Sequence, residues 1–181
     1  ARKLLAHWQD RADAIGIGVA KESWQVGGQR FESKESQRLV EAVTRVPATT
    51  GGRLTDILQE WAVRHVQNKL GNYFNNAIAL FFSGRTNYKL AQTMAEYTPN
   101  LVFADPLLQL GVPKLLTSLD TLSLYASGAH YVLEWTPERL MASAPVKEWT
   151  HFVLRRAMRD ATVIVAPVHE LDDFGAEELS G

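Results

Sequence analysis

An uninterrupted apolar run at residues 77–82 is the feature that most constrains the fold of this chain. A short strand without polar residues is typical of a strand that is buried on both faces of a parallel sheet. A turn at Ser83 and Gly84 follows the run, and the next segments predict a helix at 85–97 and a second strand at 101–104. This order of strand, helix and strand predicts two adjacent parallel strands that are joined by a right-handed crossover.

Strand and helix patterns also alternate along the rest of the chain. The further single strands that we predict lie at 14–19, 46–50 and 162–166. A hairpin is predicted around Gly27 and Gly28, because glycine tolerates the positive φ of a tight turn, and its strands are 23–26 and 29–31. Ser33 is a favourable N-cap residue, so a helix is expected from there through Arg45.

The other predicted helices carry apolar faces that we expect to pack inward. The helix that opens at Gly51 and Gly52 has the longest such face, which consists of Leu54, Ile57, Leu58, Trp61, His65 and Leu70. A helix from Pro113 to Gly128 is expected to carry Leu115, Leu116, Leu119 and Leu122. In a helix at 146–160 the inward residues are expected to be Trp149, Phe152, Val153 and Ala157. The segment 129–135 fits a strand and a helix equally well.

Together these patterns predict an α/β fold, a three-layer sandwich with helices on both sides of a mostly parallel sheet. We expect one α/β domain over residues 1–170, and a division into two lobes, 1–71 and 72–170, stays open. The segment 171–181 is acidic and ends in Ser180 and Gly181, so it is predicted to be a linker toward a C-terminal lobe that this chain lacks. The chain is therefore expected to be a fragment of a larger protein.

Composition excludes several classes of function. The 181 residues include 19 basic and 20 acidic side chains, and this balance disfavours nucleic acid as a partner. No cysteine is present, which excludes disulfides, thiol catalysis and cysteine-bound metals within the chain and fits a cytoplasmic location. No apolar stretch approaches the roughly 20 residues that span a bilayer, so we expect no membrane insertion. Metal-binding spacings are absent as well, so no metal is expected.

Candidate ligand-binding residues follow the predicted strands, because ligands of open α/β sheets bind at the carboxyl ends of strands. Gly16 and Gly18 match the first two glycines of a dinucleotide fingerprint without its third and are candidate cofactor-binding residues, with close passage of another backbone as the alternative. Thr50 and Gly51, at a helix start, are candidate substrate-binding residues, with simple helix capping as the alternative.

Two later loops add further candidates. Ser83 and Arg85 place a hydroxyl and a cation at a helix start, where capping is again the alternative to substrate binding. Asp105 follows the strand at 101–104 and is either a cap or a functional acid. His169 follows the last predicted strand and can titrate near neutral pH. We predict that Asp105 and His169 form the catalytic centre of one ligand site, unless the former caps a turn and the latter packs against the acidic tail.

The chain resembles bacterial proteins of the quinate or shikimate 5-dehydrogenase-like kind. The resemblance rests on the segments 13–18, 28–31, 45–47, 103–105 and 110–113, together with Gly51, Leu54, Asp56 and His169. It implies a Rossmann-like pair of lobes, a small oxygen-rich substrate, and NAD or NADP held mainly outside this chain. Thr50 and Thr55 stand where the family pattern has an aspartate and a lysine, a pair that can hold a hydroxyl and relay its proton.

Two functions from different classes follow from this sequence. In the first, the chain is part of a dehydrogenase and provides the pocket for the oxygen-rich substrate. In the second, it is a noncatalytic module that binds a small ligand or a protein. The sequence leaves the oligomeric state open.

Overall fold

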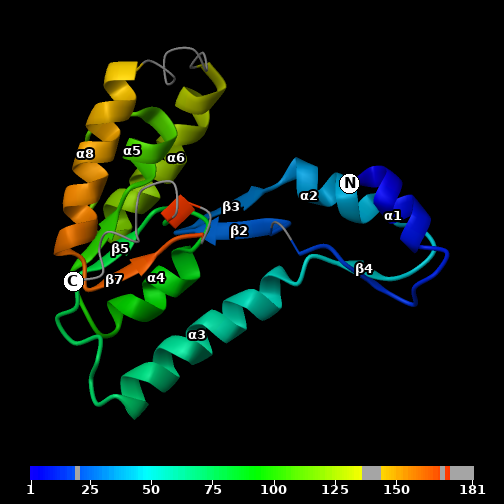
Figure 1. Cartoon of the computed structure of the whole chain (residues 1–181), viewed down its shortest axis with the longest axis horizontal. Coiled ribbons are helices and arrows are strands. Elements are labelled where there is room, and N and C mark those ends of the chain that lie inside the picture. The colour runs from blue at the N-terminus through cyan, green and yellow to red at the C-terminus, as the bar shows by residue number, and fades with distance from the viewer. Residues whose placement is uncertain (19–20, 136–143, 168–169, 172–181) are drawn as a thin grey trace.

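A three-stranded parallel sheet forms the core of the protein, whose computed structural model describes residues 1–18, 21–135, 144–167 and 170–171 (Figure 1). Strand β5 (Ala79–Phe81) lies between β6 (Leu101–Phe103) and β7 (Val163–Val165), and both pairs are parallel. Helix α4 (Tyr88–Ala95) connects β5 to β6. The predicted strands at 77–82, 101–104 and 162–166 are thus confirmed, as is the parallel pairing of the first two.

Side chains of β5 alternate between two apolar clusters, one on each face of the sheet. Phe81 packs in the first cluster with Phe103 and with residues of α3 (Gly52–Lys69), α4 and α6 (Leu119–Trp135). Leu80 packs in the second cluster with residues of α5 (Asp105–Leu110) and α8 (Ala144–Asp160). Helices therefore contact both faces of the sheet, and the strand between them is fully buried.

The first fifty residues add two small sheets. The predicted hairpin is confirmed: β2 (Ser23–Val26) and β3 (Gln29–Glu32) pair in antiparallel register, and Gly27 has the positive φ of 57° that the turn requires. Strand β1 (Ile15–Gly16) pairs in parallel with β4 (Ala48–Thr49), and α1 (Arg2–Trp8) precedes them. Ser33 caps α2 (Lys34–Glu41) as predicted, but the helix ends well before Arg45.

Helix α3 has the predicted position, but it is rotated about its own axis so that the opposite side faces the core. The face expected to pack inward is exposed, with Leu54, Ile57 and Trp61 each close to 60% accessible. The buried residues Val63 and Gln67 lie on the other side. That side is held by polar contacts to the rest of the chain, which set the rotation of the helix in spite of its apolar pattern.

Two further helix predictions are corrected. No helix begins at Pro113, because Leu116 forms an antiparallel bridge with Phe103. Helix α6 starts only after Ser118, whose Oγ accepts a hydrogen bond from the backbone N–H of Thr121. Helix α6 continues through Gly128 and includes the ambiguous segment 129–135. In α8 the buried residues are Leu154 and Met158, whereas the aromatic residues predicted to face inward, Trp149 and Phe152, are more than half exposed. The predicted Val153 and Ala157 are partly buried against the second cluster.

No helix in the described part of the chain is long and apolar enough to cross a membrane.

Gly84 follows β5 at a position where neighbouring side chains lie close to the backbone. A Cβ added there would lie 2.4 Å from Cδ1 of Phe103 and 2.9 Å from Cδ2 of Leu122. We expect Gly84→Ala to lower the free energy of unfolding by about 1–3 kcal/mol through overpacking, as measured by urea denaturation. The control is Gly128→Ala in α6, where an added Cβ meets nothing within 4 Å and should stabilise by roughly 0.5–1 kcal/mol. Equal stability of the two variants would contradict the packing at Gly84.

Candidate functional site

A cavity of about 760 Å³ lies between the β2–β3 hairpin, the start of α3 and the loop that follows β5. Four cationic side chains and one carboxylate are among the described residues that line it. These residues are Lys21, Ser23, Trp24, Gln25, Gly27, Arg30, Arg53, Asp56, Thr86, Tyr88, Lys89 and Gln92. Excess positive charge in a concave site attracts anions, so the cavity is suited to a negatively charged ligand.

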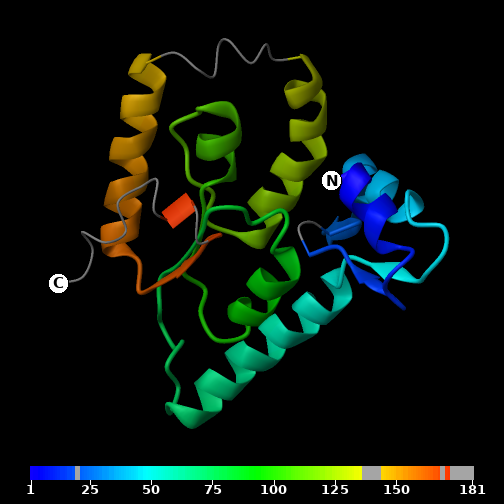
Figure 2. The same ribbon diagram turned by 45° about the vertical axis from the view of Figure 1, so that its right-hand side comes forward.

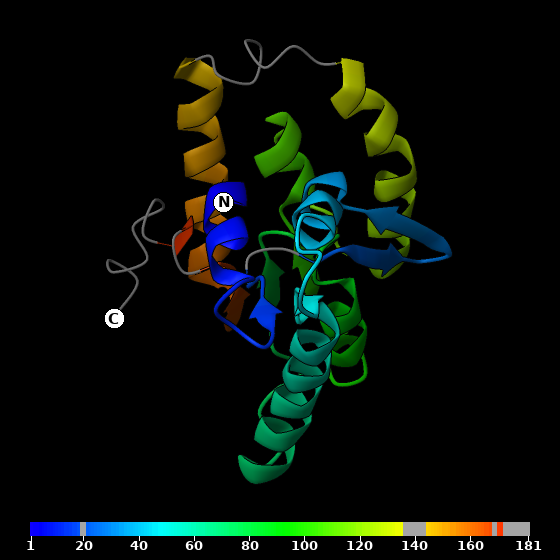
Figure 3. The same ribbon diagram turned by 90° about the vertical axis from the view of Figure 1, so that its right-hand side faces the viewer.

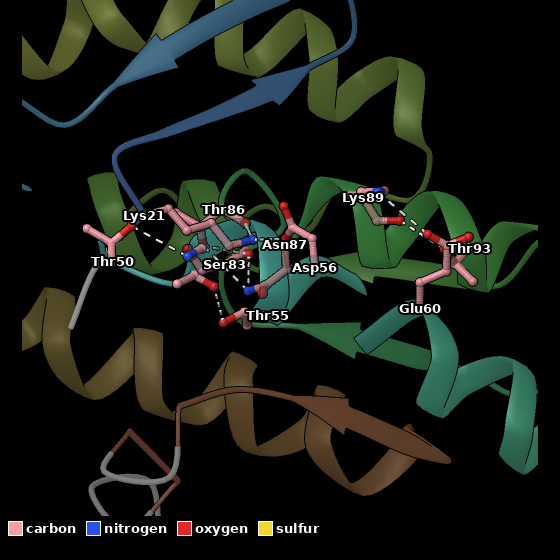
Figure 4. A network of polar contacts seen from close by, with 12 residues as sticks. Lys21, Thr50, Thr55, Asp56, Glu60, Ser83, Thr86, Asn87, Lys89 and Thr93 are labelled. Atoms are coloured by element: carbon pink, nitrogen blue, oxygen red, sulfur yellow. Dashed lines mark hydrogen bonds and ion pairs between the residues drawn. The ribbon is translucent and has the colours of Figure 1, made fainter. Parts of the chain in front are cut away.

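An ion pair between Lys21 and Asp56 lies at the wall of this cavity (Figure 4). Nζ of Lys21 is 2.5 Å from Oδ1 of Asp56 and also donates to the backbone carbonyl of Thr86 at 2.9 Å. The two side chains are 17% and 25% exposed, so each keeps some accessible surface. Lys21 therefore joins α3 to the loop after β5. Its ammonium group and the carboxylate of Asp56 lie side by side at the cavity wall.

The other cations of the cavity differ in what they bind. Lys89 lies 3.6 Å from Glu60, and Arg30 lies 3.3 Å from Glu32. Arg53 is exposed and forms no hydrogen bond or ion pair with any residue that the structure describes. Its guanidinium group is thus the one in the described cavity lining that is most available for a bidentate contact with a carboxylate or phosphate.

The predicted residues Thr50 and Gly51 line an adjoining cavity of about 630 Å³. Lys21, Arg53 and Asp56 line both cavities. The hydroxyl of Thr50 donates to the carboxylate of Glu22 at 3.2 Å and accepts from the N–H of Gly52 at 3.4 Å. Thr50 thus serves partly as a helix cap. It also lines a cavity together with the charged residues Lys21, Arg53 and Asp56.

Asp105 binds the backbone of the loop that follows β5. Its carboxylate accepts hydrogen bonds from the N–H of Gly84 at 2.8 Å and of Arg85 at 3.0 Å, and the residue is fully buried. Burial raises the pKa of this carboxyl group above its ordinary value, although the two backbone hydrogen bonds oppose the shift. The backbone N–H groups of Gly84 and Arg85, at the helix start predicted to bind substrate, are therefore occupied by Asp105.

Ser83 and Arg85 also make contacts within the fold. The carbonyl of Ser83 accepts from the side chain of Asn87 at 2.9 Å. The guanidinium of Arg85 lies 5.1 Å from the ring centre of Phe31 and donates to Gln109 at 3.2 Å. These contacts hold the hairpin and α5 against the loop.

Tyr125 belongs to the same buried polar cluster. Its hydroxyl donates to Oε1 of Gln109 at 3.2 Å. Burial, with a smaller contribution from the charge of Asp105, raises the pKa of Tyr125 to about 12. The phenol therefore stays protonated at neutral pH, which keeps its hydrogen bond to Gln109 intact.

Gly16 and Gly18 show none of the geometry that a dinucleotide fingerprint requires. A Cβ added to either would meet nothing within 4 Å, so no close backbone approach needs glycine there. Lys21 and the hairpin come next in the chain, whereas a fingerprint leads into the helix that binds the pyrophosphate. The described residues therefore do not fit a dinucleotide site at this place.

His169 lies outside the residues that the structure describes, so its pairing with Asp105 stays a prediction. No group of three or more His, Asp or Glu side chains that could hold a metal ion is found in the described ranges.

The predicted site residues do not include four charged residues of the cavity, namely Lys21, Arg53, Asp56 and Lys89, although Asp56 is among the residues that carry the resemblance. A weak signal existed, because Lys21 ends the loop of Gly16 and Gly18, and Asp56 lies one turn into α3. Nothing in the spacing of 35 residues indicates that their side chains meet.

The fold and the cavity define an α/β protein with small parallel sheets and a cationic pocket beside the loop after its central strand. The chain belongs to the family described as Domain of unknown function (DUF8754), whose family model matches residues 53–181. Residues 1–50 match a second family model, Domain of unknown function (DUF8753). No curated protein and no solved structure matches the chain.

Proposed function

We propose that the chain binds a small, oxygen-rich anion in the 760 Å³ cavity. The observation that carries this proposal is the excess of cations over carboxylates among the described residues of the cavity lining, together with the guanidinium of Arg53, which is paired with none of the described residues. Arg53 binds the carboxylate or phosphate group of the ligand, and Lys89 adds positive charge on the opposite element, α4.

The pair Lys21 and Asp56 binds a hydroxyl group of the same ligand. Its ammonium donates a hydrogen bond to the hydroxyl oxygen, and its carboxylate accepts one from the hydroxyl hydrogen. This pair supplies the two charges that the sequence lacks at Thr50 and Thr55, and Thr50 lines the adjoining cavity together with it (Figure 4). The resemblance to dehydrogenases therefore keeps a chemical basis in spite of those departures, because such a pair can relay the proton of a hydroxyl.

The dehydrogenase proposal includes a Rossmann-like three-layer arrangement, supported by the helices on both faces of the parallel sheet. It assigns substrate binding to this chain. It places NAD or NADP mainly outside the chain, and the poor fit of Gly16 and Gly18 to a dinucleotide fingerprint supports this part of the proposal. The alternative is a noncatalytic module that binds the same anion; it is favoured by the use of Asp105 as a backbone acceptor.

A thermal-shift panel tests ligand binding. The probes are quinate, shikimate, inorganic phosphate, NAD and NADP, each added to the isolated chain. At about 100 times its dissociation constant a ligand stabilises the fold by roughly 2.7 kcal/mol, which for this size raises Tm by roughly 5–10 °C. We expect a rise with at least one of the three small anions. A flat response to all three would overturn the anion proposal, and a rise with NAD or NADP would contradict the placement of the cofactor outside the chain.

Arg53→Ala is expected to weaken binding of the responding anion by about tenfold or more, because a hydrogen bond to a charged group contributes roughly 1.5–3 kcal/mol. The measurement is isothermal titration calorimetry. Arg38→Ala on α2 removes an exposed arginine that does not line the cavity and serves as the matched control. Equal affinities of these two variants would exclude the cavity as the binding site.

A further inference from the structure

Helix α3 presents an apolar side to the outside of the molecule. In Figures 1, 2 and 3 it lies along the outer edge, with α4 on one side and no other element over the opposite side. We call this side the α3 stripe. It consists of the exposed large apolar residues Leu54, Ile57, Leu58 and Trp61, together with His65, whose ring stacks on that of Trp61. The first four are between 54% and 60% exposed. Large apolar side chains with this exposure form a patch of the kind that marks an interaction surface.

Polar contacts on the inner side fix this orientation. Glu60 lies 3.6 Å from Lys89 of α4. Arg64 binds both carboxylate oxygens of Glu96, at 2.7 and 2.8 Å. The side chain of Gln67 accepts from the backbone N–H of Phe74 at 2.9 Å. Rotation of the helix to bury the stripe would break all of these contacts, so the stripe stays outward when the chain folds.

The stripe also lacks the charges that solvated helix faces carry. Residues 54, 57, 58, 61, 62 and 65 lie on one side of the helix and include no Asp, Glu, Lys or Arg. Trp61 and His65 stack with ring centres 4.8 Å apart and planes 17° from parallel, which gives the patch a flat aromatic centre. A face of this composition matches an apolar partner better than it matches water.

We propose that a second copy of this chain covers the α3 stripe, through a twofold contact that uses the same stripe on both copies. The four large apolar residues of the stripe expose roughly 500 Å² on each copy, and with His65 and the flanking residues the pair buries roughly 1,200 Å² in total, the lower end of what specific interfaces need. A twofold contact requires one patch that matches itself, and an apolar stripe without charges does.

Other surfaces of the described chain match the stripe less well. Their exposed large apolar residues stand in ones or twos on separate helices, such as Leu4 and Trp8 on α1, Leu124 on α6, and Trp149 and Phe152 on α8. A contact between the stripe and one of these would also be head-to-tail and would extend into rings or open chains instead of a twofold pair. Formation of a closed pair therefore favours a contact between the α3 stripes of the two copies.

Sedimentation equilibrium of the full chain tests the proposal. The wild type is expected at twice its mass of 20.2 kDa in the micromolar range, and Leu58→Glu and Trp61→Glu at the single mass. Both variants should keep the circular dichroism spectrum of the wild type, because the replaced side chains are more than half exposed. Trp149→Glu, an equally exposed tryptophan on α8, is the control and should stay paired. A monomeric wild type at about 100 µM, or pairing that survives in both stripe variants, would overturn the proposal.

Cross-linking gives an independent answer that does not depend on destabilising the pair. The chain has no cysteine, so a single introduced cysteine can react only with its copy in another molecule. We expect at least one of Leu54→Cys, Leu58→Cys, Trp61→Cys and His65→Cys to form a disulfide-linked pair under mild oxidation, because residues near a twofold axis come within the 4.4–6.8 Å between Cα atoms that a disulfide allows. Trp149→Cys is the control. Cross-linking at all four stripe positions no faster than at the control would exclude the stripe as the contact.

Discussion

Replacement of Phe81 by aspartate is expected to leave the chain unfolded at 25 °C. Phe81 is the last residue of the central strand, is fully buried, and packs against Phe103 with ring centres 5.3 Å apart. The substitution removes a large apolar side chain, which alone costs about 3–5 kcal/mol, and buries an unpaired charge, which costs several kcal/mol more. The sum of these two costs is comparable with the whole free energy of unfolding of a domain, which is usually about 5–15 kcal/mol. Far-ultraviolet circular dichroism and urea denaturation measure the result.

The matched control is Leu124→Asp in α6, where the wild-type side chain is 75% exposed. This variant should change the free energy of unfolding by no more than about 0.5 kcal/mol. Cooperative melting of Phe81→Asp at the temperature of the control would show that β5 does not lie between two helical layers.

Asp105→Ala is expected to lower the free energy of unfolding by about 2–4 kcal/mol. The substitution leaves the N–H groups of Gly84 and Arg85 without their acceptor at a buried position. Urea denaturation of the variant gives the loss. The control is Asp120→Ala, which removes an exposed carboxylate from the first turn of α6 and should cost less than about 1 kcal/mol. A loss at Asp105 as small as that at Asp120 would mean that the carboxylate does not hold the loop.

The pH dependence of the same residue has a defined sign. Burial raises the pKa of Asp105 in the folded state above the ordinary value of 3.8, so the folded protein takes up this proton more readily than the unfolded chain does. The contribution of Asp105 to stability therefore falls as the pH rises from 3.8 through the folded pKa. The Asp105→Asn variant has no titratable group at this position. The free energy of unfolding of the wild type minus that of this variant should therefore decrease as the pH rises over that range. A difference that grows with rising pH would contradict the raised pKa.

The sequence predicts most of the core sheet, because an apolar run such as 77–82 leaves little choice of structure. The hairpin is predicted equally well, since Gly27 and Gly28 stand between two short strand patterns. Helix α3 differs from its prediction. Its periodicity identifies one apolar side correctly, but periodicity does not say which side faces the core, and here the contacts of Glu60, Arg64 and Gln67 decide.

The candidate site is predicted only in part, because its residues come together through long-range contacts. Thr50 and Gly51 do line a cavity, as helix-start chemistry suggests. Lys21 and Asp56 carry only a weak local signal, since one lies before a hairpin and the other within a helix. Asp105 is recognisable as a carboxylate after a strand, yet only its hydrogen bonds distinguish a backbone acceptor from an acid that meets a ligand.

The strand order β6-β5-β7 has a consequence for synthesis of the chain. Ala79 pairs with Val163, so one edge of β5 stays without its partner until more than eighty further residues have left the ribosome. During that interval the apolar side of Leu80 also lacks α8, which contributes Leu154 and Met158 to the same cluster. An unpaired apolar strand edge is a template for association with other chains. A nascent chain that stops before α8 should therefore depend on a chaperone, whereas one that reaches β7 can close its own sheet.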